Sequence, residues 1–466
     1  MKKIFCALLL MTAVVGCEKV FAQYNGNHWC FGDSAYINWS NPSNPVVGNA
    51  AYYRRNGSST IGDSTGLLLY AGLINNWAPT DCYVWNKYHQ RIGDSTNIYG
   101  GFWYHSNLFI PNPGNDSLIY LLTIGVTNDP YGFYSSIINY KANNDSGFVL
   151  QKNFQWNNFP AFDGLMGVRH GNGRDWWVVF QRYTTSLSPF NSFYLFLVNV
   201  QGISGPFIQN IGTLRKTGGG QLIFNSNGSQ FAQVSWLGMI ELYNFDRCTG
   251  TITSTIPIEQ EPATSPYTHT VTTCAYSKDD SKLYVIDLSQ SNSTYYLLQY
   301  DLLATNIAAS KFVVDTFVIP VAPWTMKLAP DGKIYIAAAD GNYSWPYPDT
   351  STAFTTVNNN LSVINYPDSL GSACDFQPFS FNLGTGRSYF GLPNNPDYEL
   401  GAWVGSPCDT LSVGVDDNVP QQEVFFQAWY NSEWNMIHVN ASKLKGRTGS
   451  LRLFDMEVKP KMLLSI

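Results

Sequence analysis

Residues 329–339 read APDGKIYIAAA, a polar turn followed by a run of strand-forming residues. A similar stretch, SKDDSKLYVIDL, occupies residues 277–288. In both, Asp, Gly and Ser supply the backbone conformations that tight turns require, and the Tyr, Val and Ile that follow favour a β-strand. A pattern that recurs within one chain indicates a repeated structural unit, so its period bears directly on the fold.

The same combination of turn and strand recurs along the chain every 51 to 58 residues. The first apolar residues after the seven turns are Leu67, Leu118, Trp176, Phe231, Leu283, Ile334 and Tyr389. A short apolar segment precedes each turn, and a further strand-like segment follows, often ending in Asn or Asp. Each unit therefore holds about four strands.

A four-stranded antiparallel sheet cannot bury enough apolar surface alone, and its open edges invite aggregation. Sheets arranged radially cover one another's faces, as in β-propellers of four to eight blades. The sequence therefore predicts an all-β fold, a single β-propeller of about seven four-stranded blades with the repeated pattern at each central hairpin. Immunoglobulin-like sandwiches repeat near 100 residues and β-helix coils are far shorter, so both fit the period less well.

The composition agrees with this fold, because aromatic residues make up 15% and charged residues only 13% of a chain with 39 Gly and 24 Pro. Residues 27–40, NHWCFGDSAYINWS, have strand composition but precede the first repeated unit and have no blade of their own. We expect them to pair with residues 388–395 and so to close the ring.

Residues 1–22 have the features of an export signal. Two lysines precede an apolar stretch, residues 4–15, which is too short to span a bilayer. Small residues favour cleavage after Ala22. As an alternative, residues 14–17 resemble a lipobox, in which Cys17 would be lipidated. No other segment approaches the length of a transmembrane helix.

Removal of these residues leaves 24 basic and 32 acidic side chains, a net charge of −8, which argues against a nucleic-acid-binding surface. Six cysteines remain, and an even number in an exported chain predicts disulfides. Proximity in the sequence favours the pairs Cys248 with Cys274, Cys374 with Cys408, and Cys30 with Cys82, out of fifteen possible pairings. Buried free thiols are the alternative.

The C-terminal part differs in character from the repeats. Residues 405–423 are turn-rich and acidic, as in a linker. Residues 424–466 alternate apolar and polar side chains and resemble the first half of a small β-sandwich. The predicted order is thus a signal peptide (1–22), a propeller (23–404), a linker and this partial sandwich.

Six segments resemble, in the same order, the exported β-propeller proteins of Bacteroidetes. They are NHWCFGDSAYINW, STGLLLYAG, LFIPNPGNDSLIYLLT, GRDWWVVF, YNFDRCTG and SYFGLPNN. Such proteins often end in a sorting domain of the type IX secretion system, and the stretch GSLRLFDMEVK is similar to one, although its usual glycine, final strands and basic terminus are missing. The resemblance implies an extracellular or outer-surface location with the secretion machinery as a partner, or a periplasmic one if the tail does not function.

The sequence holds no compact catalytic or metal-binding signature such as HExxH, GxSxG, a Walker loop or CxxC. The six histidines are scattered, so we expect no metal and no cofactor. An enzyme would need paired carboxylates or an arginine clamp, for which Arg169, Arg174 and Arg182 are the only clustered candidates. The segment SKDDSKLY resembles the Asp-box of sialidases, a turn that reports on fold rather than activity.

Aromatic residues are concentrated in three predicted loops, residues 75–85, 154–162 and 342–354. Flat rings beside amides and hydroxyls suit a sugar or peptide ligand. The candidate ligand-binding residues are Trp345, Tyr347, Trp77 and Trp156. Alternatively, these rings fill gaps between blades. The sequence thus predicts a non-enzymatic binding or adhesion module for a glycan or protein ligand, with a carbohydrate-active or other hydrolytic propeller enzyme as the alternative.

Overall fold

The chain forms two compact units, Met1–Ser412 and Val413–Ile466, in a computed structural model. The structure describes residues 24–53, 57–73, 82–93, 95, 97–100, 103–126, 130–183, 190–261, 268–344, 346–409, 427–431, 436–440, 450–454 and 460–465. The predicted signal peptide and its cleavage and lipidation sites, including Cys17, lie outside these residues.

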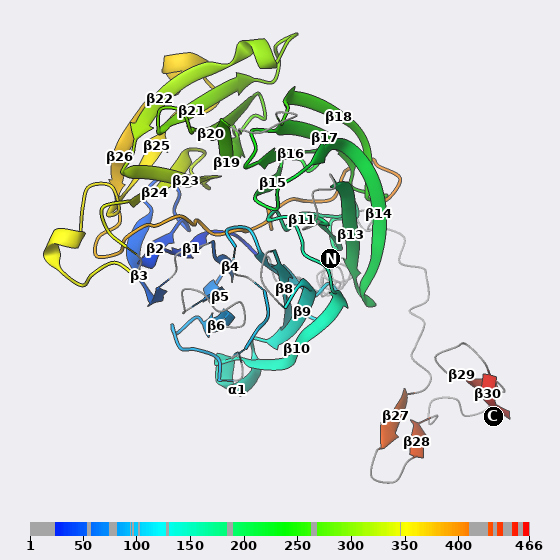
Figure 1. Ribbon diagram of the computed structural model, residues 1–466. Coiled ribbons are helices and arrows are strands. Elements are labelled where there is room, and N and C mark those ends of the chain that lie inside the picture. Colours follow the sequence, from blue (N-terminus) through cyan, green and yellow to red (C-terminus); the bar gives the residue numbers. More distant parts are fainter. Residues whose placement is uncertain are drawn as a thin grey trace, which may run out of the picture. The chain divides into compact units, whose positions relative to one another are not determined.

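Seven antiparallel sheets surround a common axis, so the predicted seven-bladed β-propeller is confirmed (Figure 1). Blade 1 consists of β1 (His28–Phe31), β2 (Asp33–Asn38) and β3 (Val46–Tyr53). Blade 2 consists of β4 (Ser59–Asp63), β5 (Gly66–Leu73) and β6 (Cys82–Asn86). Blade 3 consists of β7 (Asn107–Pro111), β8 (Leu118–Gly125), β9 (Gly132–Asn139) and β10 (Phe148–Asn157).

The remaining blades each have four strands. Blade 4 consists of β11 (Met166–Arg169), β12 (Trp176–Gln181), β13 (Phe190–Asn199) and β14 (Gly202–Arg215). Blade 5 consists of β15 (Gly220–Phe224), β16 (Gln230–Ser235), β17 (Ile240–Asp246) and β18 (Thr251–Glu259). Blade 6 consists of β19 (His269–Tyr276), β20 (Lys282–Ser289), β21 (Thr294–Asp301) and β22 (Phe312–Val318). Blade 7 consists of β23 (Val321–Leu328), β24 (Ile334–Asp340), β25 (Asn360–Ile364) and β26 (Phe376–Asn382).

Helical structure is confined to short turns between strands in the described part of the chain. These are α1 (Ala142–Asp145) and the 3-10 turns η1 (Ala308–Ser310), η2 (Ser351–Ala353) and η3 (Gly371–Cys374). None of the described helices is long and apolar enough to cross a membrane. In the C-terminal unit, β27 (Gln427–Asn431) pairs with β28 (Met436–Asn440), and β29 (Ser450–Phe454) pairs with β30 (Pro460–Ser465).

The second strand of each blade carries the repeated sequence pattern. In β12 and β24 every side chain is buried, because neighbouring blades cover both faces of the sheet. Six of the seven marked residues, Leu67 to Ile334, lie in or at the edge of such second strands. The recurring turn therefore joins the first and second strands of a blade. The prediction that it forms the central hairpin was wrong.

The seventh marked residue, Tyr389, does not lie in a blade strand, and residues 28–53 form a blade of their own. Blade 1 also has a turn followed by an apolar residue, Ala35, but only 32 residues before Leu67. This interval is shorter than the 51 to 58 residues that separate the other turns, so blade 1 does not follow the period. The predicted number of blades is thus correct. The additional blade is formed by residues 28–53, however, and not by the residues around Tyr389.

Blade 1 closes the ring by packing on blade 7. Trp29 and Phe31 share an apolar cluster with Tyr335 and Leu361. Asp33 and Arg387 exchange two backbone hydrogen bonds of 2.7 and 2.9 Å, and their side chains form a buried ion pair. We expected residues 27–40 to pair with residues 388–395. Their backbone pairing is instead limited to the bridge between Asp33 and Arg387, just before residue 388.

After this bridge, the chain crosses the centre of the propeller, a stretch that we call the axial segment (residues 387–403; Figure 1). The side-chain amide of Asn394 donates hydrogen bonds to the carbonyls of Asn107 and Leu165, at 3.0 and 2.9 Å. The Asn395 side chain exchanges two hydrogen bonds with Thr60, at 2.8 and 2.7 Å. The segment thus links the inner strands of blades 2, 3 and 4.

Three cations from different blades point at backbone carbonyls of the axial segment. Lys327 donates to the carbonyl of Asn395 at 3.2 Å, Arg169 to that of Tyr398, and Arg247 to that of Gly401, both at 2.5 Å. Burial lowers the pKa of both arginines to about 10, and that of Lys327 to about 8. All three remain mainly protonated at neutral pH and donate charge-assisted hydrogen bonds to these carbonyls.

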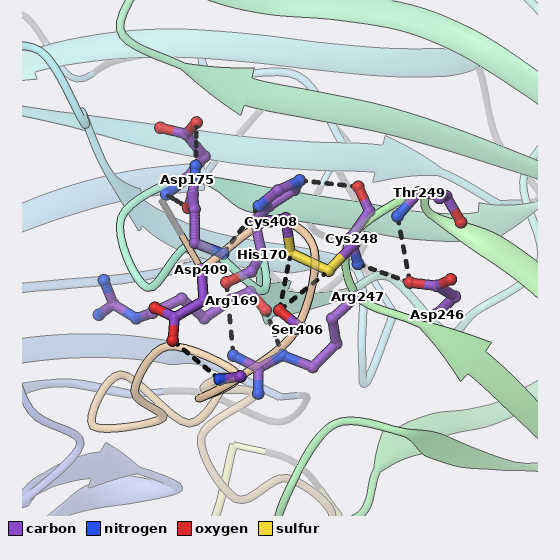
Figure 2. Close-up of a disulfide and its surroundings, with 12 residues drawn as sticks. Arg169, His170, Asp175, Asp246, Arg247, Cys248, Thr249, Ser406, Cys408 and Asp409 are labelled. Atoms are coloured by element: carbon purple, nitrogen blue, oxygen red, sulfur yellow. Dashed lines mark hydrogen bonds between the residues drawn. A yellow bond between two sulfur atoms is a disulfide. The ribbon is translucent and has the colours of Figure 1, made fainter. Parts of the chain in front are cut away.

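The end of the propeller unit is fixed by a disulfide between Cys248, which follows β17, and Cys408 (Figure 2). Gly171 passes beside it, and a Cβ at this position would lie 2.4 Å from Cys408 Sγ, so only glycine fits. The backbone N–H of Trp403 also donates to the carbonyl of Gly171. Residues of the predicted linker as far as Cys408 are therefore attached to blades 4 and 5.

The predicted disulfide pairs were wrong. Cys274 and Cys374, the predicted partners of Cys248 and Cys408, are free and buried in blades 6 and 7. Cys30 and Cys82 are buried thiols rather than a third disulfide. Proximity in the sequence failed as a guide because the axial segment brings together two cysteines separated by 160 residues.

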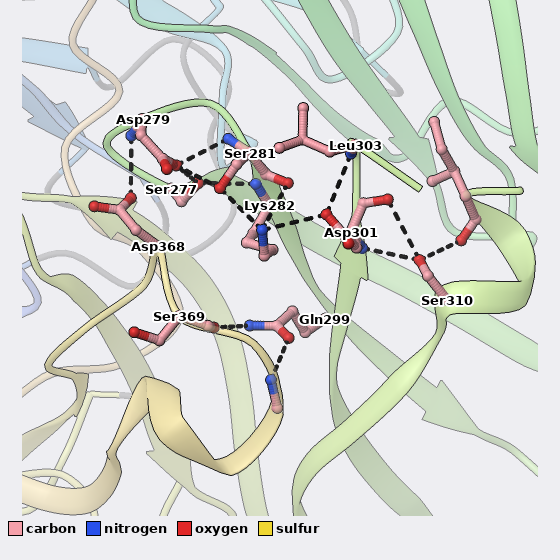
Figure 3. Close-up of polar contacts among 12 residues, drawn as sticks. Ser277, Asp279, Ser281, Lys282, Gln299, Asp301, Leu303, Ser310, Asp368 and Ser369 are labelled. Atoms are coloured by element: carbon pink, nitrogen blue, oxygen red, sulfur yellow. Dashed lines mark hydrogen bonds and ion pairs between the residues drawn. The ribbon is translucent and has the colours of Figure 1, made fainter. Parts of the chain in front are cut away.

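The turn that resembles an Asp-box is a connector between blades (Figure 3). Asp279 accepts hydrogen bonds from the hydroxyls of Ser277 and Ser281, at 2.8 and 2.6 Å. Although burial opposes the shift, these bonds lower the pKa of Asp279 to about 2. Asp279 N–H donates to Asp368 in blade 7, and Asp280 accepts from Ser226 in blade 5, so the turn ties three blades together.

We expect the Cys248→Ser, Cys408→Ser double variant to unfold at a lower denaturant concentration, with a loss of about 2–4 kcal/mol, since the disulfide restricts the unfolded chain. Chemical denaturation followed by tryptophan fluorescence measures this loss. Reductant should destabilise the original protein by a similar amount and leave the double variant unchanged. Equal stability of the two oxidised proteins would contradict the role of the disulfide.

Candidate ligand-binding site

Aromatic rings from separate parts of the propeller gather around Tyr104. Tyr104 lies beside the rings of Trp103, Trp236, Trp324 and Phe390, with centroid separations of 5.4 to 6.3 Å. Trp103 and Trp236 are 4.9 Å apart, as are Trp324 and Phe390. These rings come from three blades and the axial segment, and they pack as one aromatic cluster.

The arginines proposed for a carboxylate clamp do not converge. Arg169 is held by carbonyls of Gly173 and Tyr398, Arg174 pairs with its neighbour Asp175, and the Arg182 guanidinium lies 4.8 Å from the ring of Phe159. Within the described ranges, no cluster of three or more His, Cys, Asp or Glu side chains could hold a metal ion.

A pocket of about 560 Å³ lies on blade 3, and we call it the tyrosine–amide pocket. Its lining residues are Tyr99, Pro130, Tyr131, Tyr134, Asn153, Gln155 and Asn158. Tyr131 and Tyr134 stand at the start of β9, Asn153 and Gln155 on β10, and Tyr99 on the connection from blade 2. None of the seven side chains carries a charge at neutral pH.

Hydrogen bonds fix the walls of this pocket. Asn153 accepts from the backbone N–H of Tyr99 at 2.9 Å and donates to the carbonyl of Asn97 at 2.7 Å. The Gln155 amide donates to the Tyr131 carbonyl and the Tyr134 hydroxyl, both at 3.1 Å. The rings of Tyr99 and Tyr134 meet edge to face at 5.6 Å. The pocket is therefore preorganised rather than formed by loose side chains.

Two glycines allow the tyrosines to approach one another. Gly132 has φ +143°, and a Cβ there would lie 2.3 Å from the carbonyl oxygen of Asn157. Gly100 has φ +75°, and a Cβ there would collide with the backbone of Ile124. Each glycine follows a pocket tyrosine, so the Tyr-Gly steps at 99–100 and 131–132 are the sequence signal that could have indicated this site.

Two of the four predicted ligand-binding residues lie in the interior or between blades. Tyr347 is buried against Tyr389, under the guanidinium of Arg387. Trp156 is half-buried on the opposite face of β10 from Gln155, packs against Phe196 of blade 4, and donates to Ser135. The alternative, that these rings fill gaps between blades, describes both better. Trp345 and Trp77 lie outside the described residues.

One of the three predicted aromatic loops contributes to the pocket, but through other residues than the predicted tryptophan. The segment 154–162, chosen for its aromatic rings, contributes Gln155 and Asn158 to the pocket. Its tryptophan faces the neighbouring blade because side chains alternate along β10. Sequence reasoning missed Tyr99, Tyr131 and Tyr134, since they come from segments without an obvious cluster of aromatic residues.

No family model and no curated protein matches the chain. Solved structures are similar at the level of fold. A quinonprotein alcohol dehydrogenase-like protein from Bacteroides thetaiotaomicron is 11% identical with a TM-score of 0.42, over 79% of this chain and 77% of that one. The Dos1 propeller is 10% identical with a TM-score of 0.41, over 80% and 88%. An auxiliary nutrient binding protein from the same Bacteroides species is 10% identical with a TM-score of 0.33, over 62% and 67%.

The fold and the pocket together define a seven-bladed β-propeller with a segment across its centre and a neutral polar pocket on one blade. The assignment of the fold rests on the sheets of this chain itself, because the similar structures are distant.

We expect Tyr347→Ala to lower the free energy of unfolding by about 3 kcal/mol, since it removes a buried ring and leaves a cavity beside Arg387. Thermal and chemical denaturation measure the loss. Tyr366→Ala is a matched control, because its side chain is 62% exposed and its removal should change stability by less than about 0.5 kcal/mol. A stable Tyr347→Ala protein that has lost ligand binding would favour the original binding hypothesis.

Proposed function

We propose that this protein is an exported, non-enzymatic binding module that holds a glycan or protein ligand at the tyrosine–amide pocket. One observation carries the proposal: three tyrosines and three amides line a preorganised pocket of about 560 Å³, within the range of small-molecule sites. Rings supply contact area, and amides and hydroxyls supply directional hydrogen bonds. Binding without turnover suits this lining, which lacks the paired carboxylates that glycoside hydrolysis requires.

The test is binding of the purified protein, residues 23–466, to printed arrays of glycans and of short peptides. A double variant, Tyr99→Ala with Asn158→Ala, should lose at least tenfold in affinity for the ligand that the original protein captures, about 1.4 kcal/mol. Tyr366→Ala, exposed on blade 7, should bind normally.

Retained binding by the double variant would contradict the assignment of the site. Mass spectrometry of the captured ligand after incubation separates the two functional classes. An unchanged ligand supports a binding module, whereas cleavage products would favour the hydrolytic alternative.

Export is part of the proposal. The basic and apolar character of residues 1–22 supports it, as does the disulfide between Cys248 and Cys408, because disulfides persist in oxidising compartments. The sorting role of residues 424–466 is supported by the resemblance of GSLRLFDMEVK to a type IX sorting domain.

Two measurements on the protein made in its own host check export. We expect the mature chain to begin at Gln23, and N-terminal sequencing would contradict this with a start at Met1. If Cys17 is lipidated instead, the first residue would be that modified cysteine. Removal of residues 424–466 should shift the protein from the medium or outer surface to the periplasm, and unchanged distribution would contradict a sorting role.

A further inference from the structure

The polar groups of the tyrosine–amide pocket divide into those that build its walls and those that remain available. The Tyr134 hydroxyl donates to the Tyr131 carbonyl and accepts from Gln155, so it is already engaged in two hydrogen bonds within the wall. By contrast, the Tyr99 hydroxyl, the Gln155 side-chain oxygen and the Asn158 side chain have no hydrogen-bond partner among the described residues. The pocket therefore presents both donors and acceptors.

The neutrality of the lining limits the ligand. Transfer of a carboxylate or phosphate from water to a site without a cationic partner costs several kcal/mol. No lysine, arginine or histidine lines this pocket. The geometry therefore favours a ligand with neutral hydroxyl or amide groups and disfavours an acidic one.

Peptide addition at the edge of β10 is the rival mode of binding, because β10 is the outermost strand of blade 3. Strand addition needs a regular row of backbone groups. The pairing of β10 with β9 is instead interrupted three times, between Val149 and Gln151, Gln151 and Phe154, and Gln155 and Asn157. Asn153 has φ +55°, which further breaks the extended backbone. Such bulges protect an edge from pairing.

We propose that the tyrosine–amide pocket binds a neutral sugar unit of a glycan and discriminates against acidic sugars. A pyranose has an apolar face that packs on a tyrosine ring, while its hydroxyls both donate and accept, which matches the Tyr99 hydroxyl and the Gln155 and Asn158 amides. This inference rests on the proposed function, since it names the ligand class for the same site.

The experiment is isothermal titration calorimetry of the full mature chain with neutral trisaccharides of glucose, mannose and galactose, and with trigalacturonic acid as the acidic counterpart of galactose. We expect at least one neutral trisaccharide to bind, with trigalacturonic acid at least tenfold weaker. Equal or tighter binding of trigalacturonic acid would overturn the inference, as would the failure of all neutral trisaccharides to bind.

Two mild variants tie the binding to the pocket. Tyr99→Phe removes one hydroxyl and keeps the ring, and Asn158→Ala alters an exposed side chain, so both should fold normally. Each should weaken neutral sugar binding about three- to tenfold. Tyr366→Phe removes a hydroxyl from an exposed tyrosine on blade 7 and should have no effect. Neutral sugar binding that neither pocket variant weakens would also overturn the inference.

The failure of this inference differs from the failure of the proposed function. If the peptide array captures a ligand that the pocket variants lose, while neutral sugars do not bind, the site is a binding site and the sugar assignment is wrong. If neither arrays nor calorimetry detect a ligand that depends on the pocket, both proposals are wrong.

Discussion

The hydrogen bonding of the axial segment to the surrounding blades is the constraint on which the rest of the structure depends. Blades meet at the axis with their first strands, and the backbone and polar side chains there need partners that neighbouring blades supply only in part. The axial segment provides them, with Asn394 and Asn395 bridging the inner strands and three buried cations fixing its carbonyls. A single stretch of the chain thereby hydrogen-bonds to several blades at once.

This arrangement also bears on the proposed ligand site. Propeller sites often lie on the axis, where loops of all blades converge, but here the axial segment crosses this region and hydrogen-bonds to the inner strands of blades 2, 3 and 4. The tyrosine–amide pocket instead lies on the outer two strands of blade 3 and on the connection from blade 2. The pocket that we propose as the ligand site therefore lies on the flank of one blade.

The sequence predicted the fold well because second strands are covered on both faces, which makes them continuous apolar runs after a polar turn. Blade 1 was not predicted because its turn lies only 32 residues before Leu67, outside the period of 51 to 58 residues. The disulfide partner of Cys248 lies 160 residues away, and no local pattern encodes a contact made through the axis. Trp156 was predicted as a ligand-binding residue, and it lies on β10, one of the strands that line the pocket. The pocket is lined by the opposite face of that strand, which carries Gln155.

The axial segment comes last in the propeller unit, which has a consequence for the order of assembly. When the seven blades have been synthesised, they still lack the two asparagines, the carbonyls that accept from Lys327, Arg169 and Arg247, and the second cysteine. The ring therefore reaches its final packing only after the complete unit has left the ribosome. Until then the chain stays incompletely assembled, because the part made last supplies these contacts.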